Sequence, residues 1–357
     1  MICIHPVADS WSDRWAEICT QRKVPFLSWD IFQPEVLGKL RDENVQGVLF
    51  DLPLFDRRTA IAARHMVRAL EAMGILVFPN HESYWHYDDK IAQVYLFQML
   101  QIPSCPTWVF YDAAEAIAWA ARSNYPKVWK LKNGAASSNV MLVNSESQAR
   151  RLIRRAFGAG HSPVAPLLSD LKTKAYKHKQ QRDWSQLIRR LPQTLNNVFR
   201  HRRDVPPERG YAYFQEFLPG NSYDTRITVI GNRAFGFRRF VRTNDFRASG
   251  SGRIDYDPGA IDLEGVSLAF DAAARIGAQC LAFDIVYLPN RKPVVLEVCY
   301  RFVDQAILNC AGFWDRQLVF HSGKLWPQDA ILEDFLETLK LTSEHQVNPK
   351  PLPVLRT

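Results

Sequence analysis

The sequence lacks the features that mark several large classes of protein. No apolar run reaches the roughly 18 residues that a membrane-spanning helix needs, so we expect no membrane association. Apolar residues make up 47% and charged residues 23%, which excludes a disordered chain, a collagen and a coiled coil. The N-terminal segment MICIHPVADSW breaks at His5 and Pro6 and has no basic stretch. We therefore expect no secretory signal and a cytoplasmic protein.

Several local motifs are missing as well. The six cysteines have no CxxC spacing, so they predict reduced thiols rather than a disulfide framework or a zinc site. No GxGxxG follows the first predicted strand, and GxxxxGK[ST] is absent, which excludes a dinucleotide fingerprint and a Walker A loop. Internal repeats and low-complexity tracts are also absent.

Positive charge is concentrated in one part of the chain. The net charge is +8, but residues 150–209 contain fifteen basic and four acidic residues, so the rest of the chain is net negative. A basic insert at 157–210 indicates either a docking surface for an anionic partner or a solvated elaboration. No recognised nucleic-acid motif accompanies it, so nucleic acid is not favoured as the partner.

The first 85 residues alternate between strand and helix patterns. Short β-prone apolar runs are expected to form buried strands at 1–7, 24–32, 45–55 and 74–80. The segments between them predict helices at 11–22, 34–43 and 57–73. This alternation is typical of a parallel α/β sheet.

The rest of the chain mixes helices with paired strands. Helices are predicted at 88–101, 113–123, 184–191 and 266–277. Strands are predicted at 107–112 and on both sides of a turn within 125–143, and regular structure resumes at 211–220. Two hairpins are predicted, one turning at Gly231-Asn232 and one at Pro289-Asn290. The fold class is therefore α/β with α+β parts, which at this length fits two or three domains.

Asp284 and Glu297 are the first candidate functional residues. Each lies in an apolar strand, and the two strands form one predicted hairpin. Two carboxylates that face one cleft from adjacent strands make an oxygen site suited to Mg²⁺. The alternative is a pair of acids that face solvent or pair with arginines.

Basic residues supply the other candidates. Lys130 ends a predicted strand just before a turn of small residues at 133–139, whose amides can wrap phosphate oxygens. Lys127 and Lys130 cannot share a strand face, so at least one must point inward. The alternative is an exposed strand lysine.

Four arginines lie on or near the first predicted hairpin. Their planar guanidinium groups suit carboxylates and phosphates, although a solvated charged face is the alternative. They are Arg226, Arg238, Arg239 and Arg247.

The order of these motifs is more specific than any one of them. Pro79-Asn80, Asp89-Lys90, the P-x-V-x-K segment that ends at Lys130, QEFLPG, D-x-R, DFR, Asp284 and L-E-V follow one another over residues 75–305. This series resembles the ATP-grasp superfamily, and it looks most like the branch of RimK-type glutamate ligases and glutathione synthetases. The resemblance implies two α+β subdomains that grip ATP, preceded by a small parallel α/β domain.

The same resemblance divides the chain into five parts. These are an N-terminal α/β domain (1–85), a central ATP-grasp subdomain that acts as a lid (86–156), the basic insert (157–210), a C-terminal ATP-grasp subdomain (211–340) and a flexible tail (341–357).

The resemblance also implies a role for each candidate. Lys90 and Lys130 match the lysines that hold the ATP phosphates. Gln215, Glu216 and Leu218 match the hinge that meets adenine, and Asp224 matches the ribose contact. Arg226 and Arg247 match the arginines that bind the acceptor carboxylate and the acyl phosphate, with Arg238 near the γ-phosphate. Asp284 and Glu297 match two of three Mg²⁺ ligands.

The implied function is that of an ATP-dependent carboxylate–amine ligase. Such an enzyme makes an amide through an acyl phosphate and releases ADP and phosphate. Its substrates would be a carboxylate and an amine, such as an amino acid, a peptide or an acidic glycan. The sequence leaves both a monomer and a homo-oligomer as alternatives. The alternatives are an ATP-grasp phosphotransferase and a non-catalytic ATP-binding regulatory protein.

Two departures from the family pattern bear on the metal and phosphate sites. Cys299 stands where the family usually has an asparagine ligand, and a thiol is a poor partner for Mg²⁺. Glu297 with water, or a neighbour such as Asp304 or Asn309, would then have to hold the second metal. The turn at 133–139 also has one glycine where relatives often have several.

Overall fold

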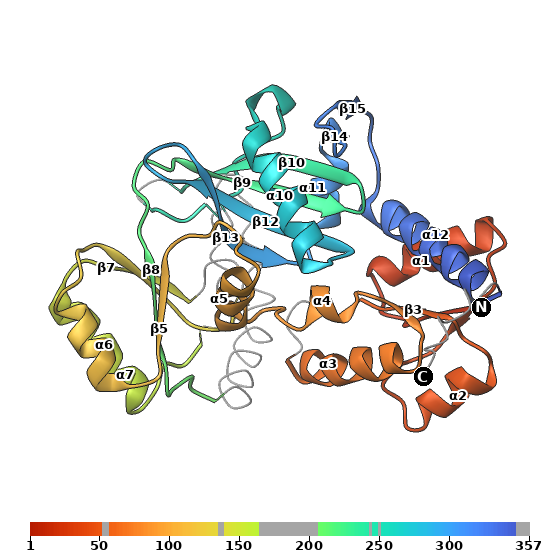
Figure 1. The fold of residues 1–357 in the computed structure, drawn as a ribbon, viewed down its shortest axis with the longest axis horizontal. Coiled ribbons are helices and arrows are strands. Elements are labelled where there is room, and N and C mark those ends of the chain that lie inside the picture. The colour runs from red at the N-terminus through yellow and green to blue at the C-terminus, as the bar shows by residue number, and fades with distance from the viewer. Residues whose placement is uncertain (52–56, 135–138, 164–205, 243–244, 249–250, 348–357) are drawn as a thin grey trace, which may run out of the picture.

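The structure is a computed structural model that describes residues 1–51, 57–134, 139–163, 206–242, 245–248 and 251–347, with the backbone alone at 57–61 and 342–347. Its strands form three sheets (Figure 1). Most of the basic insert, the helix expected at 184–191, the middle of the turn at 133–139 and the end of the tail lie outside the described residues. Among the described residues, no helix is long and apolar enough to cross a membrane.

The first sheet is parallel, as the sequence predicts. Its order is β2-β1-β3-β4, and every adjacent pair runs parallel. The strands are β1 (Ile2–Ile4), β2 (Phe26–Ser28), β3 (Gly47–Leu49) and β4 (Leu76–Phe78). The intervening helices are α1 (Trp11–Gln21), α2 (Val36–Asp42) and α3 (Arg57–Ala72), close to the expected bounds.

Each face of this sheet packs against a different pair of helices. Side chains alternate along a strand, so Ile2 and Ile4 share one face of β1 while Cys3 lies on the other. Cys3 packs in the cluster that holds α2 and α3. The isoleucines pack with α1 and with α12 (Pro327–Val347), a long helix near the C-terminal end that the sequence reading missed. The N-terminal sheet therefore shares its core with the last described helix (Figure 1).

A short connection leads to the second, antiparallel sheet. It contains α4 (His81–Tyr84) and α5 (Lys90–Met99). The sheet has the order β5-β8-β6-β7, with strands β5 (Thr107–Phe110), β8 (Ala212–Glu216), β6 (Lys127–Lys130) and β7 (Val140–Val143). Two helices pack on one of its faces around Trp129 and Phe214 (Figure 1). They are α6 (Ala113–Ala120), which was expected, and α7 (Glu146–Phe157), which was not.

The third sheet is the largest. Its order is β13-β12-β9-β10-β14-β15, with β11 (Ile254–Asp255) paired to β10. The strands are β9 (Tyr223–Ile230), β10 (Arg233–Phe240), β12 (Cys280–Tyr287), β13 (Pro293–Cys299), β14 (Gly312–Trp314) and β15 (Phe320–Ser322). Both predicted hairpins are confirmed, since β9 pairs with β10 across Gly231-Asn232 and β12 pairs with β13 across Pro289-Asn290.

One face of the large sheet changes character along its strands. The opposite face packs throughout against α10 (Leu263–Ile276). On the first face, Cys280 and Ala282 are apolar, and the next position of the same parity on β12 is Asp284. On β10, Phe235 and Phe237 lead in the same way to Arg239. Polar groups thus gather at the end of this face that lies toward the second sheet.

Candidate active site

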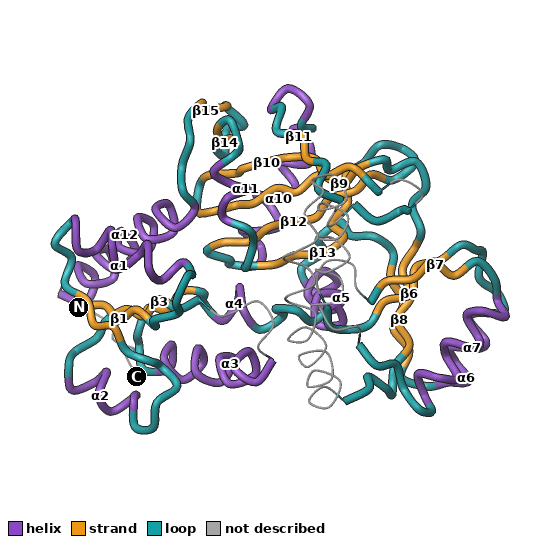
Figure 2. The backbone as a smooth tube through the Cα atoms, turned by 180° about the vertical axis from the view of Figure 1, so that it is seen from behind, coloured by secondary structure: helices purple, strands orange, loops and turns teal. Residues whose placement is uncertain are grey.

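A cavity of about 380 Å³ lies between the two antiparallel sheets. Its walls come from β6, β7 and β8 on one side and from β9, β12 and β13 on the other. Helix α5 lies between these sheets (Figure 2), because Ile91 and Val94 pack against Tyr211 and Tyr213 while the helix also contacts β13. The helix thereby brings its first residue, Lys90, to the cavity wall.

Lys90 is held firmly at the start of α5. Asp89 caps the helix by accepting bonds from the amides of Ile91 and Ala92, at 3.1 and 3.0 Å. The Lys90 ammonium donates to the Gly134 carbonyl at 2.8 Å and lies 3.2 Å from a Glu297 carboxylate oxygen. Burial by itself would lower the pKa of Lys90, but the nearby carboxylates of Glu297 and Asp88 outweigh it and raise that pKa. The side chain therefore stays charged.

Lys130 also lines the cavity, from the last residue of β6. It is buried, and within the described part of the chain its ammonium makes no hydrogen bond or ion pair. Burial lowers its pKa, although the Glu297 carboxylate opposes that effect. Lys127 is buried too, but it is paired to Glu216 at 2.6 Å and lies over the Trp108 ring. Lys130 is therefore the lysine whose charge can pair with an anionic ligand.

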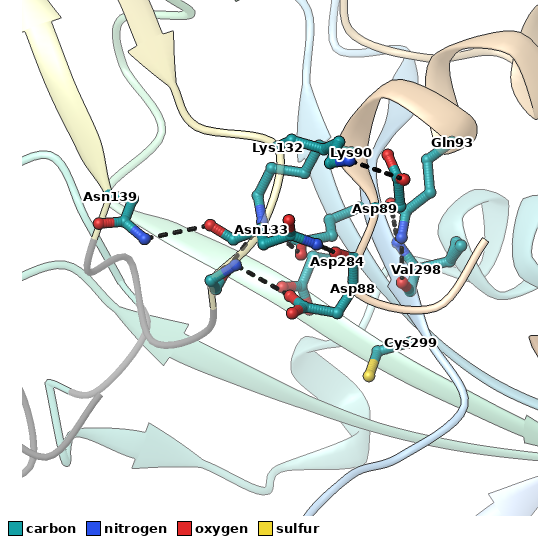
Figure 3. Close-up of polar contacts among 12 residues, drawn as sticks. Asp88, Asp89, Lys90, Gln93, Lys132, Asn133, Asn139, Asp284, Val298 and Cys299 are labelled. Carbon is teal, nitrogen blue, oxygen red and sulfur yellow. Dashed lines mark hydrogen bonds and ion pairs between the residues drawn. The ribbon is translucent and has the colours of Figure 1, made fainter. Parts of the chain in front are cut away.

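The turn after β6 is tied to the residues that precede α5 (Figure 3). The Gly134 amide donates to the Asp88 carboxylate at 2.9 Å, and the Asn133 side chain donates to the Asp88 carbonyl. The Lys90 amide donates to the Lys132 carbonyl at 2.9 Å. At the other end of the turn, the Asn139 side chain donates to the Asn133 carbonyl at 3.1 Å. Gly134, near the start of the predicted phosphate turn, and Val140, just after its end, both line the cavity.

Asp284 and Glu297 face the cavity side by side, directly opposite each other across β12 and β13. Their partners differ. Glu297 pairs with Lys90, whereas Asp284 accepts two bonds from Arg226, at 2.7 and 2.9 Å, and lies 2.8 Å from Arg239. Burial alone would raise the pKa of Asp284, but these guanidinium groups hold it below its usual value. Pairing with arginines, the alternative considered from the sequence, is therefore what Asp284 does.

The structure corrects the placement of one predicted arginine. Arg238 lies on the opposite face of β10, where it pairs with Asp255 and stacks over Tyr223 at 4.9 Å. Its neighbour Arg239 lies on the cavity face because side chains alternate along the strand. The two-residue turn at Gly231-Asn232 sets Arg239 opposite Asp224, so the hairpin register carried a signal that could have identified it.

The other predicted nucleotide residues line the cavity with most of their polar groups already engaged. Gln215 donates to the Thr107 hydroxyl at 3.0 Å, while Leu218 contributes an apolar contact surface. Asp224 accepts two bonds of 2.7 Å from Arg239, and burial raises its pKa despite that pairing. The Asp224 carboxylate is therefore committed to Arg239.

Arginines also line the other end of the cavity. Arg247 bonds to the Asp245 carboxylate at 2.9 and 2.6 Å. Arg301, which the sequence reading missed, lies 2.7 Å from the buried Asp51 and 4.2 Å above the Trp11 ring. Only its position just after the L-E-V segment could have drawn attention to it.

The donor set suits one divalent cation better than two. Within the described ranges, no three His, Cys, Asp or Glu side chains gather to hold a metal. Burial raises the pKa of Cys299 to about 12, so its thiol stays protonated and donates to the Arg301 carbonyl at 2.9 Å. Neither suggested substitute lines the cavity, because Asp304 bonds to Gln328 at 2.7 Å and Asn309 to Gln305 at 3.1 Å. Glu297 is the carboxylate that fits an incoming Mg²⁺.

The cavity thus has two chemically different ends. Val128, Val140 and Leu296 give the hinge end, which lies beside Gln215 to Leu218, an apolar lining that suits a flat ring. Lys90, Lys130 and the arginines give the other end a cationic lining that suits phosphates and carboxylates. The arrangement matches a nucleotide that carries several phosphates.

Comparison with known proteins gives structural matches alone. No protein-family model and no curated protein match this chain. A solved structure of a RimK domain protein ATP-grasp from Sphaerobacter thermophilus is 15% identical, with a TM-score of 0.53 over 94% of this chain and 98% of that one.

Two further solved structures are similar to the same extent. The ATP-grasp ligase PsnB, complexed with minimal precursor, Mg and ADP, is 13% identical, with a TM-score of 0.55 over 95% of this chain and 98% of that chain. The D-cycloserine synthetase DcsG is 14% identical, with a TM-score of 0.54 over 94% and 99%. At these identities the likeness establishes the fold, over nearly the full length of each chain.

Proposed function

We propose that this chain, which has the ATP-grasp fold, is an ATP-dependent ligase that joins a carboxylate to an amine. The observation that carries the proposal is Lys130, a buried ammonium in the cavity with no partner among the described residues. A buried charge is costly unless something pairs with it, so this position favours an anionic ligand. Lys90, beside it, keeps its own charge and faces the same space.

The residues would divide the work between the two ends of the cavity. The hinge and its apolar neighbours receive the adenine, while Lys90 and Lys130 hold the phosphates. Arg226 and Arg247 line the space beyond and orient the carboxylate. Mg²⁺ that arrives with the nucleotide would be held at Glu297 and would neutralise phosphate charge.

The chemistry needs no nucleophile from the protein. A carboxylate oxygen of the substrate attacks the terminal phosphorus of ATP, and ADP leaves, which produces an acyl phosphate. The amine nitrogen then attacks the carbonyl carbon, phosphate leaves, and the nitrogen loses a proton to form the amide. Positioning and charge neutralisation supply the rate enhancement, and water must be kept from the acyl phosphate.

The substrates are proposed only as classes. PsnB, one of the similar structures, was solved with a precursor peptide and AMPPNP. A peptide or an amino acid is accordingly the first class to screen as the carboxylate or the amine here. The cationic lining near Arg247 and Arg301 favours an acceptor that carries a carboxylate.

Calorimetric titration of ATP with Mg²⁺ into the purified protein tests the nucleotide site. We expect the Lys130→Ala variant to lose at least about tenfold in affinity, because a charge-assisted phosphate contact is worth about 1.5–3 kcal/mol. The matched control is Lys292→Ala, which removes an exposed lysine from the turn between β12 and β13. Equal affinities in the two variants would refute the proposed phosphate site.

Hydroxylamine tests the ligase chemistry, since it traps an acyl phosphate as a hydroxamate. When the protein is incubated with ATP, Mg²⁺, hydroxylamine and a panel of amino acids and acidic peptides, the accepted substrate should give ADP and hydroxamate in equal amounts. A phosphotransferase would release ADP without hydroxamate.

A non-catalytic nucleotide-binding protein is the second candidate function. The engagement of Asp284 by two arginines and the protonated Cys299 favour it, because both reduce the metal site. Tight ATP binding with no ADP release across the whole panel would support this candidate over the ligase.

A further inference from the structure

We infer that the nucleotide site of this protein takes one divalent cation, at Glu297, and that Asp284 serves as the counter-ion of Arg226 and Arg239 instead of as a metal ligand. The inference rests on the proposed function, because the cation arrives with the nucleotide. It concerns how many cations the site holds, which the fold alone does not fix.

The contacts of Asp284 carry the argument. One carboxylate oxygen accepts from the Arg226 Nε at 2.7 Å, and the other accepts from the Arg226 Nη2 at 2.9 Å. The second oxygen also lies 2.8 Å from Arg239 Nη2. A cation would therefore have to displace guanidinium groups from both oxygens.

Displacing them would leave a buried charge without its partner. Arg239 is 7% exposed and its other hydrogen bonds go to Asp224, so it cannot turn to water. Breaking a buried ion pair from one side is strongly destabilising, because it leaves an uncompensated buried charge. Inserting a metal into the cluster of Arg226, Arg239, Asp224 and Asp284 would therefore carry this penalty.

Glu297 has the opposite surroundings. Its partner among the described residues is Lys90, and that contact uses one carboxylate oxygen at 3.2 Å. The side chain is 31% exposed, toward the cavity, which leaves room for a hydrated cation. Mg²⁺ keeps several waters and needs only one or two carboxylates besides phosphate oxygens.

The next position along β13 on the same face offers no second ligand. Cys299 lies opposite Ala282 in the register, and its thiol donates to the Arg301 carbonyl. A thiol is soft, whereas Mg²⁺ takes hard oxygen ligands. In place of a second cation, this wall holds a charge-balanced cluster of two guanidinium groups and two carboxylates.

Counting bound Mn²⁺ tests the inference without relying on turnover. Protein in excess over ADP is titrated with MnCl₂, and the free ion is followed by electron paramagnetic resonance. We expect one Mn²⁺ for each bound ADP. Two Mn²⁺ for each ADP would overturn the inference, while failure of ADP to bind would overturn the proposed function and this inference with it.

Three variants separate the roles of the candidate ligands. Glu297→Gln should weaken Mn²⁺ binding to the ADP complex at least about tenfold, the loss expected when a charged ligand becomes neutral. Asp284→Asn should keep its Mn²⁺ affinity within about threefold of the wild-type value. Cys299→Asn should still bind one Mn²⁺ for each ADP, because Asp284 remains paired with the two arginines.

Asp284→Asn also removes a counter-ion, so its melting temperature should fall even though its metal affinity does not. If that variant does not fold, the number of Mn²⁺ ions bound for each ADP in the wild type and in Cys299→Asn still tests the inference. A second Mn²⁺ in Cys299→Asn, or a loss of Mn²⁺ affinity in a folded Asp284→Asn that equals the loss in Glu297→Gln, would refute the inference.

Discussion

Lys127 and Lys130 lie three residues apart in β6, and both are buried, yet their surroundings make them chemically different. Lys127 has a carboxylate partner in Glu216 and an aromatic ring beneath it, so its charge is satisfied inside the protein. Lys130 has neither, and burial lowers its pKa. One lysine therefore holds the hinge strand in place, while the other is available to a ligand.

This difference predicts how nucleotide affinity depends on pH. The charged form of Lys130 binds phosphate, and its pKa lies below the ordinary 10.5, so affinity should fall as the pH rises through that lowered pKa. Above it, the contribution of Lys130 should decline by up to about tenfold for each pH unit. Lys90 should not contribute to the fall, since its pKa is raised.

ADP titrations between about pH 7 and pH 10 would measure this dependence. The Lys130→Arg variant is the control, because a guanidinium stays charged throughout that range. The wild type should lose affinity toward high pH and the variant should not. Parallel curves for the two proteins would show that another group titrates.

At the same scale, the sequence identified most residues of the site but not their partners. Lys90, Lys130, Asp284 and Glu297 all line one cavity, as their motifs predict. Arg238 was preferred to Arg239 because adjacent arginines look alike in a motif, whereas the strand register distinguishes them. The pairing of Asp284 with two arginines depends on three strands meeting, which local sequence does not reveal.

Among the elements, α5 and the turn after β6 work together. The helix begins at Lys90, and the same short segment holds the start of that turn, at Lys132 to Gly134, through Asp88 and the Lys90 amide. A helix cap therefore also positions a cation in the cavity. The cap residue, Asp89, does not itself line the cavity.

Replacing that cap should have two separable effects. Asp89→Ala should lower the free energy of unfolding by about 1 kcal/mol, the usual cost of losing an N-cap. It should also weaken ADP binding several-fold, because the start of α5 frays and Lys90 moves with it. Chemical denaturation and ADP titration measure the two effects.

The matched control is Asp112→Ala at the cap of α6. Asp112 accepts from the Glu115 amide at 2.9 Å, on a helix that packs away from the cavity. It should lose similar stability and keep its ADP affinity. If both variants bind ADP equally well, the cap does not position Lys90.

The elements that sequence predicts well are those with local signals. The four strands and three helices predicted in the first 85 residues and both hairpins are found near their expected positions, because apolar runs and turn residues mark them, whereas the short helix α4 was not predicted. Helix α7 was missed because its basic residues, between 150 and 155, were considered only as part of the charged stretch 150–209. Helix α12 was missed because its apolar side chains pack against β1 and α1, which lie far away in the sequence.

For the whole molecule, the contact between α12 and the N-terminal sheet is the main connection that the sequence did not predict. Trp15 donates to the Gln328 carbonyl at 3.1 Å, and Arg14 pairs with Asp329. Ile2, Trp11, Ala330 and Phe335 share one apolar cluster with the cavity-side face of the large sheet. Strand β1, helix α1 and helix α12 therefore pack together as one unit.

A substitution at Gly47 tests the contact between α12 and the N-terminal sheet directly. A Cβ atom added there would lie 2.8 Å from the Phe335 ring, without any backbone penalty from a positive φ. Gly47→Ala should therefore destabilise the protein by about 1–3 kcal/mol, the range for overpacking a core. Thermal unfolding would measure the loss, and Phe335→Leu should recover part of it in the double variant.

Gly38→Ala is the matched control in the same N-terminal unit. Nothing lies within 4 Å of the added Cβ, and Gly38 lies inside α2. That variant should gain about 0.5–1 kcal/mol, because alanine loses less backbone entropy in a helix than glycine. If Gly47→Ala proves as stable as Gly38→Ala, Phe335 does not pack on β3.

The shared core has a consequence for synthesis on the ribosome. Translation adds roughly 5–20 residues each second from the N-terminus, so β1 and α1 emerge long before α12 does. Until Ala330 and Phe335 are made, Ile2 and Trp11 lack part of the apolar surface that covers them in the finished protein. The face of the N-terminal sheet that carries Ile2 is therefore fully covered only after the last described helix has been made.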